Sequence, residues 1–112
     1  MHHKDQKWVK RPDMPDVEIA PGTTRSILAY CDAVMCAEHR FKKGAVGALH
    51  SHPHTQITYV LSGEFEFTIG DETRTIKTGD SLLKQHGEMH GCVCIEDGAL
   101  LDIFVPMRED FV

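Results

Sequence analysis

The segment Glu64–Ile69 alternates strictly between polar and apolar side chains, and this pattern constrains the fold more than any other part of the chain. In an extended strand its two phenylalanines and its isoleucine lie on one face, and its polar side chains lie on the other. Turn-forming pairs flank the segment, Ser62-Gly63 before it and Gly70-Asp71 after it, and they predict two consecutive β-hairpins. No helical period extends beyond two turns, so the sequence predicts an all-β fold.

The 112 residues fit one domain. From residue 24 onward, glycine, proline and aspartate interrupt a series of short strand-like runs. The predicted strands are Arg25–Tyr30, Val34–Phe41, Gln56–Leu61, Glu64–Ile69, Thr73–Thr78, Ser81–Lys84, His90–Ile95 and Ala99–Val105. Many short strands with closely spaced turns are typical of a sandwich or barrel. Residues 1–22 contain three prolines and are predicted to be an irregular or edge-strand lead-in to a domain over residues 23–112.

Charge and hydropathy argue against two classes of partner. The formal net charge is −5, and the one dense basic stretch, from Lys4 to Arg11, is predicted to be a solvated tail, so we expect no nucleic-acid partner. No apolar run approaches the roughly 18–20 residues of a membrane span, and the polar N-terminus lacks a secretory signal. We therefore expect no membrane partner and a location in the cytoplasm, where the four cysteines would be free thiols.

Three histidines and a glutamine form the pattern that most clearly predicts chemistry. His50 and His52 are two residues apart, and in an extended segment both side chains project to the same face. Gln56 begins the next predicted strand, where its amide oxygen could reach the same point, and His90 near the start of a later strand would be the fourth ligand. Imidazoles suit zinc, nickel, copper and iron, whereas an amide oxygen is a weaker ligand. Taken alone, the pattern also fits a solvated His-Ser-His-Pro-His loop.

Other potential ligands have weaker patterns. His54 follows the first pair beyond a proline, and we expect a supporting or exposed role for it. Cys92 and Cys94 could offer two thiolates to a metal, but one residue separates them, which is less than in the usual zinc knuckle. His39, like the two histidines at the N-terminus, belongs to no recognisable pattern.

The last predicted strand places an aspartate among apolar residues. By alternation Asp102 and Phe104 share one face, and three aliphatic side chains share the other. A buried, unpaired carboxylate is costly, so alternation alone leaves two alternatives open. In one, Asp102 and a partly exposed Phe104 face outward. In the other, both lie inside a barrel and face the metal, and Arg108 just beyond the strand returns to cap the mouth.

The spacing of the two histidine-containing segments resembles the two motifs of the cupin family. The first is represented by Gly44-x5-His50-x-His52-x3-Gln56-x6-Gly63, and the second by Gly79-x5-Gln85-x-Gly87-x2-His90. This resemblance implies a single cupin domain, which is a double-stranded β-helix or jelly-roll barrel. It also implies one divalent transition metal ion, either zinc, nickel, manganese or iron, and the ligands would be His50, His52, Gln56 and His90.

Two longer stretches, from His50 to Val60 and from Leu101 to Phe111, are similar to one small group, the KdgF-type pectin-degradation cupins. Members of this group convert 4,5-unsaturated monouronates from pectin or alginate to the linear ketonised form. The resemblance implies that Asp102, Phe104 and Arg108 lie in the active site. From their chemistry we hypothesise that Asp102 is the general acid–base, that Phe104 packs against the sugar ring and that Arg108 pairs with the substrate carboxylate. The substrate would be a small anionic sugar, and the protein is predicted to be a homodimer.

Two positions depart from most cupins, since Gln56 stands in place of a glutamate and Gln85 in place of a proline. A neutral ligand set leaves the ion's dipositive charge uncompensated, so the centre should attract anionic oxygens and act as a Lewis acid. It should also hold its metal less tightly than a carboxylate-containing site. Two other functions stay open, a non-catalytic uronate- or sugar-binding protein and a metal-dependent cupin dioxygenase.

Overall fold

Eight β-strands and two 3-10 turns make up the fold in this computed structural model, which describes residues 3–112. The strands are β1 Val17–Ala20, β2 Thr23–Cys31, β3 Val34–Phe41, β4 Val46–His50, β5 Thr55–Ile69, β6 Glu72–Lys77, β7 Ser81–Lys84 and β8 His90–Val105. The 3-10 turns η1 and η2 cover Arg11–Asp13 and Glu109–Phe111. The all-β prediction is confirmed. Within the described residues, no helix has the length and apolar character needed to cross a membrane.

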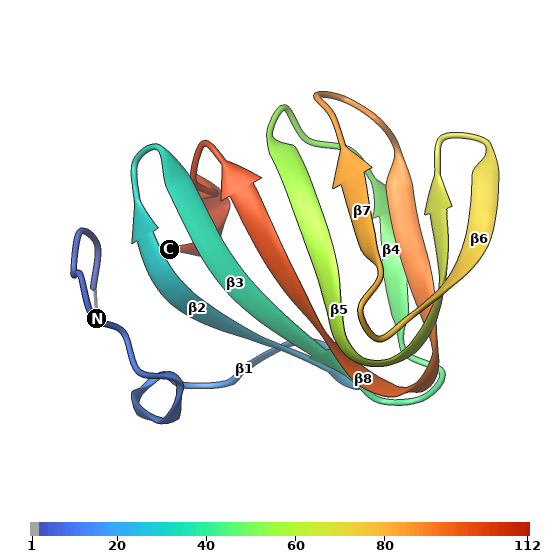
Figure 1. Cartoon of the computed structure of the whole chain (residues 1–112), viewed down its shortest axis with the longest axis horizontal. Coiled ribbons are helices and arrows are strands. Elements are labelled where there is room, and N and C mark those ends of the chain that lie inside the picture. The colour runs from blue at the N-terminus through green and yellow to red at the C-terminus, as the bar shows by residue number, and fades with distance from the viewer. Residues whose placement is uncertain (1–2) are drawn as a thin grey trace.

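The strands pair antiparallel in the order β1-β2-β3-β8-β5-β6, with β4 on β8 and β7 on β5. The two longest strands, β5 and β8, bend along their length and take part in two layers (Figure 1). The first layer contains β1, β2, β3, the second half of β8, the first half of β5, and β7. The second contains β4, the first half of β8, the second half of β5, and β6.

The prediction of a turn at Ser62-Gly63 was wrong, because β5 continues through this pair. Its pairing register with β8 shifts between Val60 and Phe65, where the strand passes from one layer to the other. Gly63 has φ +85°, and a Cβ atom there would lie 2.6 Å from the carbonyl oxygen of Asp97. The glycine is therefore needed for a bend and a close approach of two backbones rather than for a hairpin.

The two predicted strands at the C-terminal end likewise form one bent strand, β8. The second predicted hairpin is confirmed, because Gly70-Asp71 joins β5 to β6. The sequence patterns missed β4, in which Gly47 and Ala48 weaken the strand preference. Inside the predicted lead-in, β1 pairs with β2 as the edge strand of the first layer.

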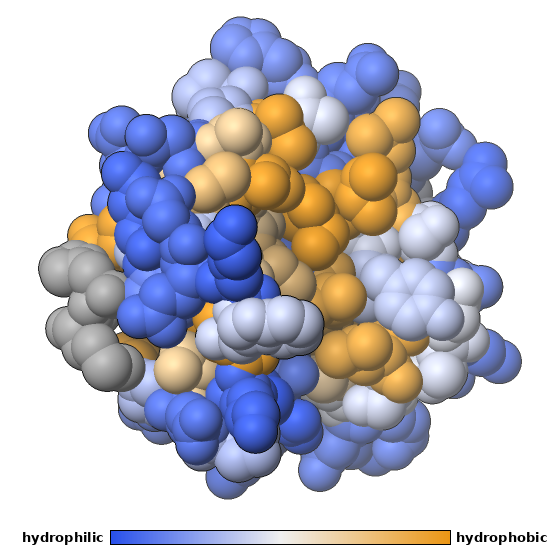
Figure 2. Space-filling view, turned by 60° about the vertical axis from the view of Figure 1, so that its left-hand side comes forward, coloured by the Kyte–Doolittle hydropathy of each residue, from blue (hydrophilic) through white to orange (hydrophobic). Residues whose placement is uncertain are grey.

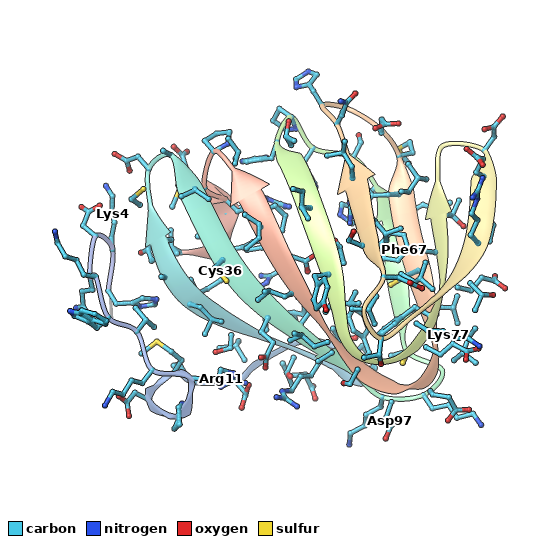
Figure 3. All side chains as sticks on the ribbon, viewed as in Figure 1. Lys4, Arg11, Cys36, Phe67, Lys77 and Asp97 are labelled. Atoms are coloured by element: carbon cyan, nitrogen blue, oxygen red, sulfur yellow. The ribbon has the colours of Figure 1, made fainter. Side chains whose placement is uncertain are left out.

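The core lies between the two layers and contains the apolar face of the segment Glu64–Ile69 of β5. Phe65 and Phe67 are buried, whereas Glu66 between them is exposed. Figure 3 shows Phe67 between the layers and Lys77 at their outside. A second buried cluster contains Tyr30, Met35 and Phe104 and lies toward the C-terminal turn η2. The barrel interior between these clusters is not wholly apolar, and its polar part forms the candidate site.

Candidate metal centre and its cavity

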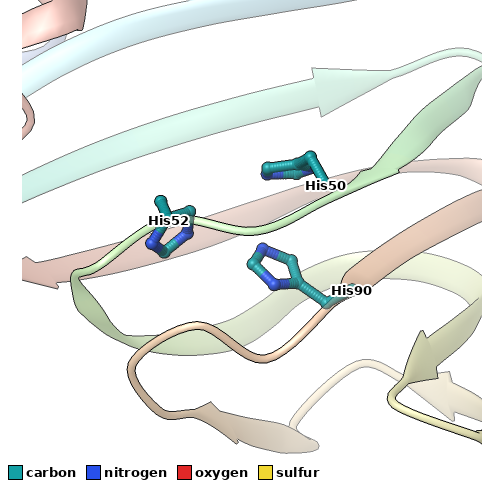
Figure 4. A group of neighbouring side chains, drawn as sticks. All are labelled: His50, His52 and His90. Atoms are coloured by element: carbon teal, nitrogen blue, oxygen red, sulfur yellow. The ribbon is translucent and has the colours of Figure 1, made fainter.

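Three histidines converge at one end of the barrel (Figure 4). His50 ends β4, His90 begins β8 opposite it, and His52 lies in the loop after β4. The ring of His90 lies 4.4 Å from that of His50 and 4.9 Å from that of His52, measured between centroids. One nitrogen of each ring lies within 4.8 Å of the other two. The predicted histidine ligands therefore come together in space.

Backbone carbonyls fix the orientation of two of these rings. His50 Nδ1 donates to the carbonyl oxygen of Ala48 at 2.7 Å, and His90 Nδ1 donates to that of Glu88 at 3.1 Å. A carbonyl only accepts, so each ring carries its proton on Nδ1 and keeps a free lone pair on Nε2. Burial lowers the pKa of His90 to about 4 and also lowers the pKa of His52. Both rings are therefore neutral near pH 7, as metal ligands must be.

Gln56 completes the set at the start of β5. Its Oε1 lies 2.9 Å from Nε2 of His52, and its amide nitrogen donates to Asp102 Oδ1 at 2.8 Å. The carboxylate thus turns the amide so that its oxygen faces the imidazole of His52. Three imidazoles and one amide oxygen fit a borderline divalent transition metal ion.

The thiols do not join this cluster. All four cysteines are free, and burial raises the pKa of Cys92 to about 11, so this thiol stays protonated at neutral pH. His54 also lies outside the group of three. Its ring packs 5.3 Å from that of His52, and its Nε2 lies 3.1 Å from the carbonyl oxygen of Met107.

Asp102 faces the barrel interior, which decides between the two orientations that alternation left open. It is 4% exposed and Phe104 is 2% exposed, whereas Val105 on the opposite face is 51% exposed. Asp102 Oδ1 accepts hydrogen bonds from the Thr58 hydroxyl and the Gln56 amide. Burial by itself would raise the pKa of Asp102, but hydrogen bonds and nearby positive charge outweigh it and hold this pKa below its usual value.

The second oxygen of Asp102 is held by a histidine that the sequence analysis passed over. His39 Nδ1 donates to Asp102 Oδ2 at 2.7 Å, and Arg25 Nε donates to His39 Nε2 at 3.0 Å. Because the guanidinium can only donate, Nε2 accepts and the proton of the ring lies on Nδ1. The position of His39 follows from alternation with the buried Met35 and Ala37 on β3, which was the signal available in the sequence.

Lys84 is the other residue that the sequence analysis missed. It is 1% exposed, and its Nζ donates to Thr58 Oγ1 at 2.6 Å. Burial lowers its pKa to about 8, and the negative charge of Asp102 partly opposes this shift. Alternation with the half-buried Leu82 indicated its direction, but a lysine at the end of a short strand is usually solvated.

Arg108 and Phe104 lie at the cavity wall as a cation beside aromatic rings. The guanidinium carbon of Arg108 is 5.1 Å from the ring centroid of Phe104 and 4.3 Å from that of Phe111. Its Nε and Nη2 bind the two carboxylate oxygens of Asp110 at 3.0 and 2.8 Å. Arg25 stacks on Phe111 as well, with its guanidinium carbon 3.3 Å from the ring centroid.

One cavity of about 460 Å³ connects these groups. Its wall includes two of the three histidines, Gln56 and five charged side chains. These residues are His50, His90, Gln56, Arg25, Lys84, Asp102, Arg108 and Asp110. Three of the four predicted ligands and all three predicted substrate-contacting residues therefore line one cavity. Such a space suits a small polar molecule that carries negative charge.

Comparison with known proteins agrees with the fold. A family model described as "Cupin domain" matches residues 37–105. The pectin degradation protein KdgF of Dickeya dadantii (strain 3937) is 42% identical over 102 residues, which cover 89% of this chain and 93% of that protein. The structure of KdgF from Halomonas sp. matches with a TM-score of 0.90 and 34% identity, covering 94% of this chain and 97% of the other. An RmlC-like cupin from Shewanella frigidimarina matches with a TM-score of 0.93 and 34% identity, covering 96% of each chain.

These matches confirm the jelly-roll prediction, since they extend over nearly the whole chain and both layers. The chain belongs to the cupin family, within the small single-domain group that includes the pectin degradation protein KdgF.

Proposed function

We propose that this protein catalyses the metal-dependent ring opening of 4,5-unsaturated monouronates and so acts in the breakdown of pectin or alginate. The observation that supports this most is the content of the cavity of about 460 Å³. Two of the three clustered histidines, His50 and His90, line it beside a buried carboxylate, an aromatic ring and an arginine. The chain around it is 42% identical to a pectin degradation protein.

One divalent ion, either zinc, nickel, manganese or iron, would be held by His50, His52, His90 and Gln56, and would act as a Lewis acid toward oxygens of the substrate. Because none of these ligands is an anion, they would leave the positive charge of the ion uncompensated, and this charge would attract the negatively charged substrate.

Arg108 is the residue that we propose to bind the substrate carboxylate. Asp110 occupies the edge formed by Nε and Nη2, so the remaining edge of the guanidinium is available for a second carboxylate. Phe104 beside it offers a flat apolar surface to the sugar ring. Together these two side chains would orient the sugar within the cavity.

Asp102 is the group that we propose to carry the proton. In ring opening, the hemiacetal hydroxyl loses a proton, the bond between its carbon and the ring oxygen breaks, and the alkene takes up a proton as the ketone forms. One proton leaves and one returns, so one carboxylate can serve both steps. Asp102 has a lowered pKa and is therefore ionised at neutral pH, as a proton acceptor must be. Three of its four lone-pair positions are occupied, which leaves one for the substrate.

The test follows loss of the ring alkene by NMR with purified, metal-loaded protein and freshly generated 4,5-unsaturated uronate. We expect acceleration over an enzyme-free blank, and we expect the variants His50→Ala and Asp102→Asn to lose it. Asp102→Asn should keep its metal, because Asp102 is not among the nitrogen ligands.

A rate equal to the blank, with the metal present, would contradict the proposal. Uronate binding without turnover would then indicate a sugar-binding protein. Oxygen consumption with an iron- or manganese-loaded sample would indicate dioxygenase chemistry instead.

We also propose that the protein is a homodimer. The outer faces of β5, β7 and β8 expose Ile57, Leu83 and Val105, and Trp8 in the N-terminal segment is 87% exposed. Figure 2 shows apolar side chains gathered in a broad patch on the face that it displays. Patches of this kind are typical of protein–protein interfaces. Sedimentation equilibrium at micromolar concentration should give twice the chain mass of 12.6 kDa, and a monomer would contradict the proposal.

A further inference from the structure

A row of hydrogen-bonded polar side chains crosses five neighbouring strands of the first layer. One member comes from each strand, in the order Arg25 on β2, His39 on β3, Asp102 on β8, Thr58 on β5 and Lys84 on β7. Four of its five members line the cavity, all but Thr58, and the row has a cation at each end. The bond between Thr58 and Asp102 connects its two halves, so the carboxylate lies in the middle.

The ammonium of Lys84 is incompletely satisfied within the protein. Its hydrogen-bond partner among residues 3–112 is the Thr58 hydroxyl, and the ring of Phe67 lies 4.6 Å from its Nζ. By contrast, Arg108 binds both oxygens of one carboxylate directly. An ammonium has three N–H donors, and a buried one without a contacting carboxylate is costly. The cost would be offset if an anionic oxygen of a bound molecule took the remaining donors.

The charges of the cavity wall also favour the binding of an anion. Arg25, Lys84 and Arg108 face the space together with Asp102 and Asp110, which makes three cations against two carboxylates. This excess of positive charge exists before any metal ion is counted, in a chain whose formal net charge is −5. The cavity is therefore built for more negative charge than the protein itself supplies.

We infer that Lys84 is a further catalytic residue, whose ammonium donates a hydrogen bond to the substrate oxygen that becomes negative during ring opening. The inference rests on the proposed function. When Asp102 takes the hemiacetal proton, the bond to the ring oxygen breaks and its electron pair stays on that oxygen as an enolate. The enolate then becomes the ketone while the neighbouring alkene carbon takes the proton back from Asp102. Lys84 forms no covalent bond, and no other reactant is needed.

A fixed donor in a buried site stabilises charge that develops there far better than water does. Since burial lowers the pKa of Lys84 to about 8, its ammonium form predominates at pH 7. The alternative role is structural, with Lys84 acting only through Thr58 to hold Asp102 in place. The two roles differ in what happens when Thr58 is changed and Lys84 is kept.

The experiment compares Lys84→Met, Thr58→Val and the double variant with the wild type. Lys77→Met is the control, since Lys77 is exposed on β6. We measure three quantities: kcat and KM from loss of the ring alkene, the metal content, and the affinity for galacturonate. Galacturonate is a saturated uronate, so its ring oxygen develops no negative charge. We expect Lys84→Met to lower kcat by about 100-fold, as for loss of one oxyanion-hole donor. Metal content and galacturonate affinity should change by less than about threefold. Thr58→Val should lower kcat less, and the double variant should lose more than either single variant.

Several results would overturn the inference. One is a kcat of Lys84→Met within threefold of the wild type, and another is an equal loss in Lys84→Met, Thr58→Val and the double variant. If Lys84→Met does not fold, Lys84→Gln provides the test, since its amide keeps an N–H donor near Thr58 but lacks the positive charge. Its kcat should fall by about 10-fold or more while galacturonate affinity stays within about threefold, and an unchanged kcat would reject the role. A wild type without activity would overturn the proposed function and this inference with it. An active wild type with an unaffected Lys84→Met would overturn this inference alone.

Discussion

Replacing Asp102 by asparagine should destabilise the fold as well as abolish the proposed activity. Asp102 accepts from Thr58 and Gln56 on one oxygen and from His39 on the other. An asparagine has one oxygen and one NH2 group, so in either orientation the NH2 group meets a donor. His39 cannot present a lone pair instead, because its Nε2 already accepts from Arg25. At least one buried donor is therefore left without an acceptor.

The magnitude follows from two terms. An unsatisfied buried donor costs about 1–3 kcal/mol. The buried ammonium of Lys84 also loses the negative charge of Asp102, and a broken buried ion pair costs about 3–5 kcal/mol. Because Lys84 reaches Asp102 only through Thr58, we expect the second term to be a fraction of that range. A total of about 3 kcal/mol is reasonable, which corresponds to a fall in Tm of roughly 10 °C for a domain of this size.

The measurement is thermal unfolding by circular dichroism at pH 7 with a chelator present, so that metal binding does not enter. Asp71→Asn is the control, because Asp71 is an exposed carboxylate in the turn between β5 and β6. Combining Asp102→Asn with Lys84→Met should cost less than the sum of the two changes, since the second removes a charge that the first leaves uncompensated. A Tm of Asp102→Asn within 2 °C of the wild type would refute this account of the polar row.

Three further predictions concern the bend, the metal and the buried lysine. Gly63→Ala should lower the free energy of unfolding by more than about 2 kcal/mol, because the alanine would combine a positive φ with a backbone clash. Gly70→Ala should cost about 1 kcal/mol, because Gly70 has a positive φ but open space around it. Urea titrations of the two variants measure these losses. A saturating divalent ion should raise the Tm of the wild type, and His90→Ala should abolish this shift in the same scan. Between pH 8 and 10 the unfolded chain keeps the proton that folded Lys84 has lost, so wild-type stability relative to Lys84→Met should rise with pH; a fall would contradict the lowered pKa.

Local patterns were sufficient for most of the fold. Alternation in Glu64–Ile69 predicted its buried and exposed faces, because a strand in a sheet has a fixed period of two. The Ser62-Gly63 pair shows where local reasoning fails. A glycine with positive φ serves a hairpin turn and a strand bend equally well, and only the partner strand distinguishes them. The Cβ clash at Gly63 involves Asp97, which is far away in the sequence.

The candidate site likewise has a part that local patterns predict and a part that depends on strand pairing. His50, His52 and Gln56 lie within seven residues, so their meeting could be predicted from the local chain, and His90 followed from the spacing of the second motif. The polar row could not be predicted in this way. Its members come from five strands, and their contacts depend on pairing registers such as that between Thr58 and Asp102. The period of two left two possible orientations for Asp102, and it did not show which of them is buried.

The bending of β5 and β8 divides the site between two separate parts of the barrel. Two of the three histidines belong to β4 and the first half of β8, while the polar row belongs to the other layer. Each part has its own backbone pairing, and Gln56 connects them through its hydrogen bonds to His52 and Asp102. Mutations could therefore exchange the acid, the base or the cations of one layer while the imidazoles of the other keep their geometry. A barrel divided like this would let the polar residues of one layer change during evolution while the histidines keep their positions, provided that Gln56 keeps a hydrogen-bond partner in the place of Asp102.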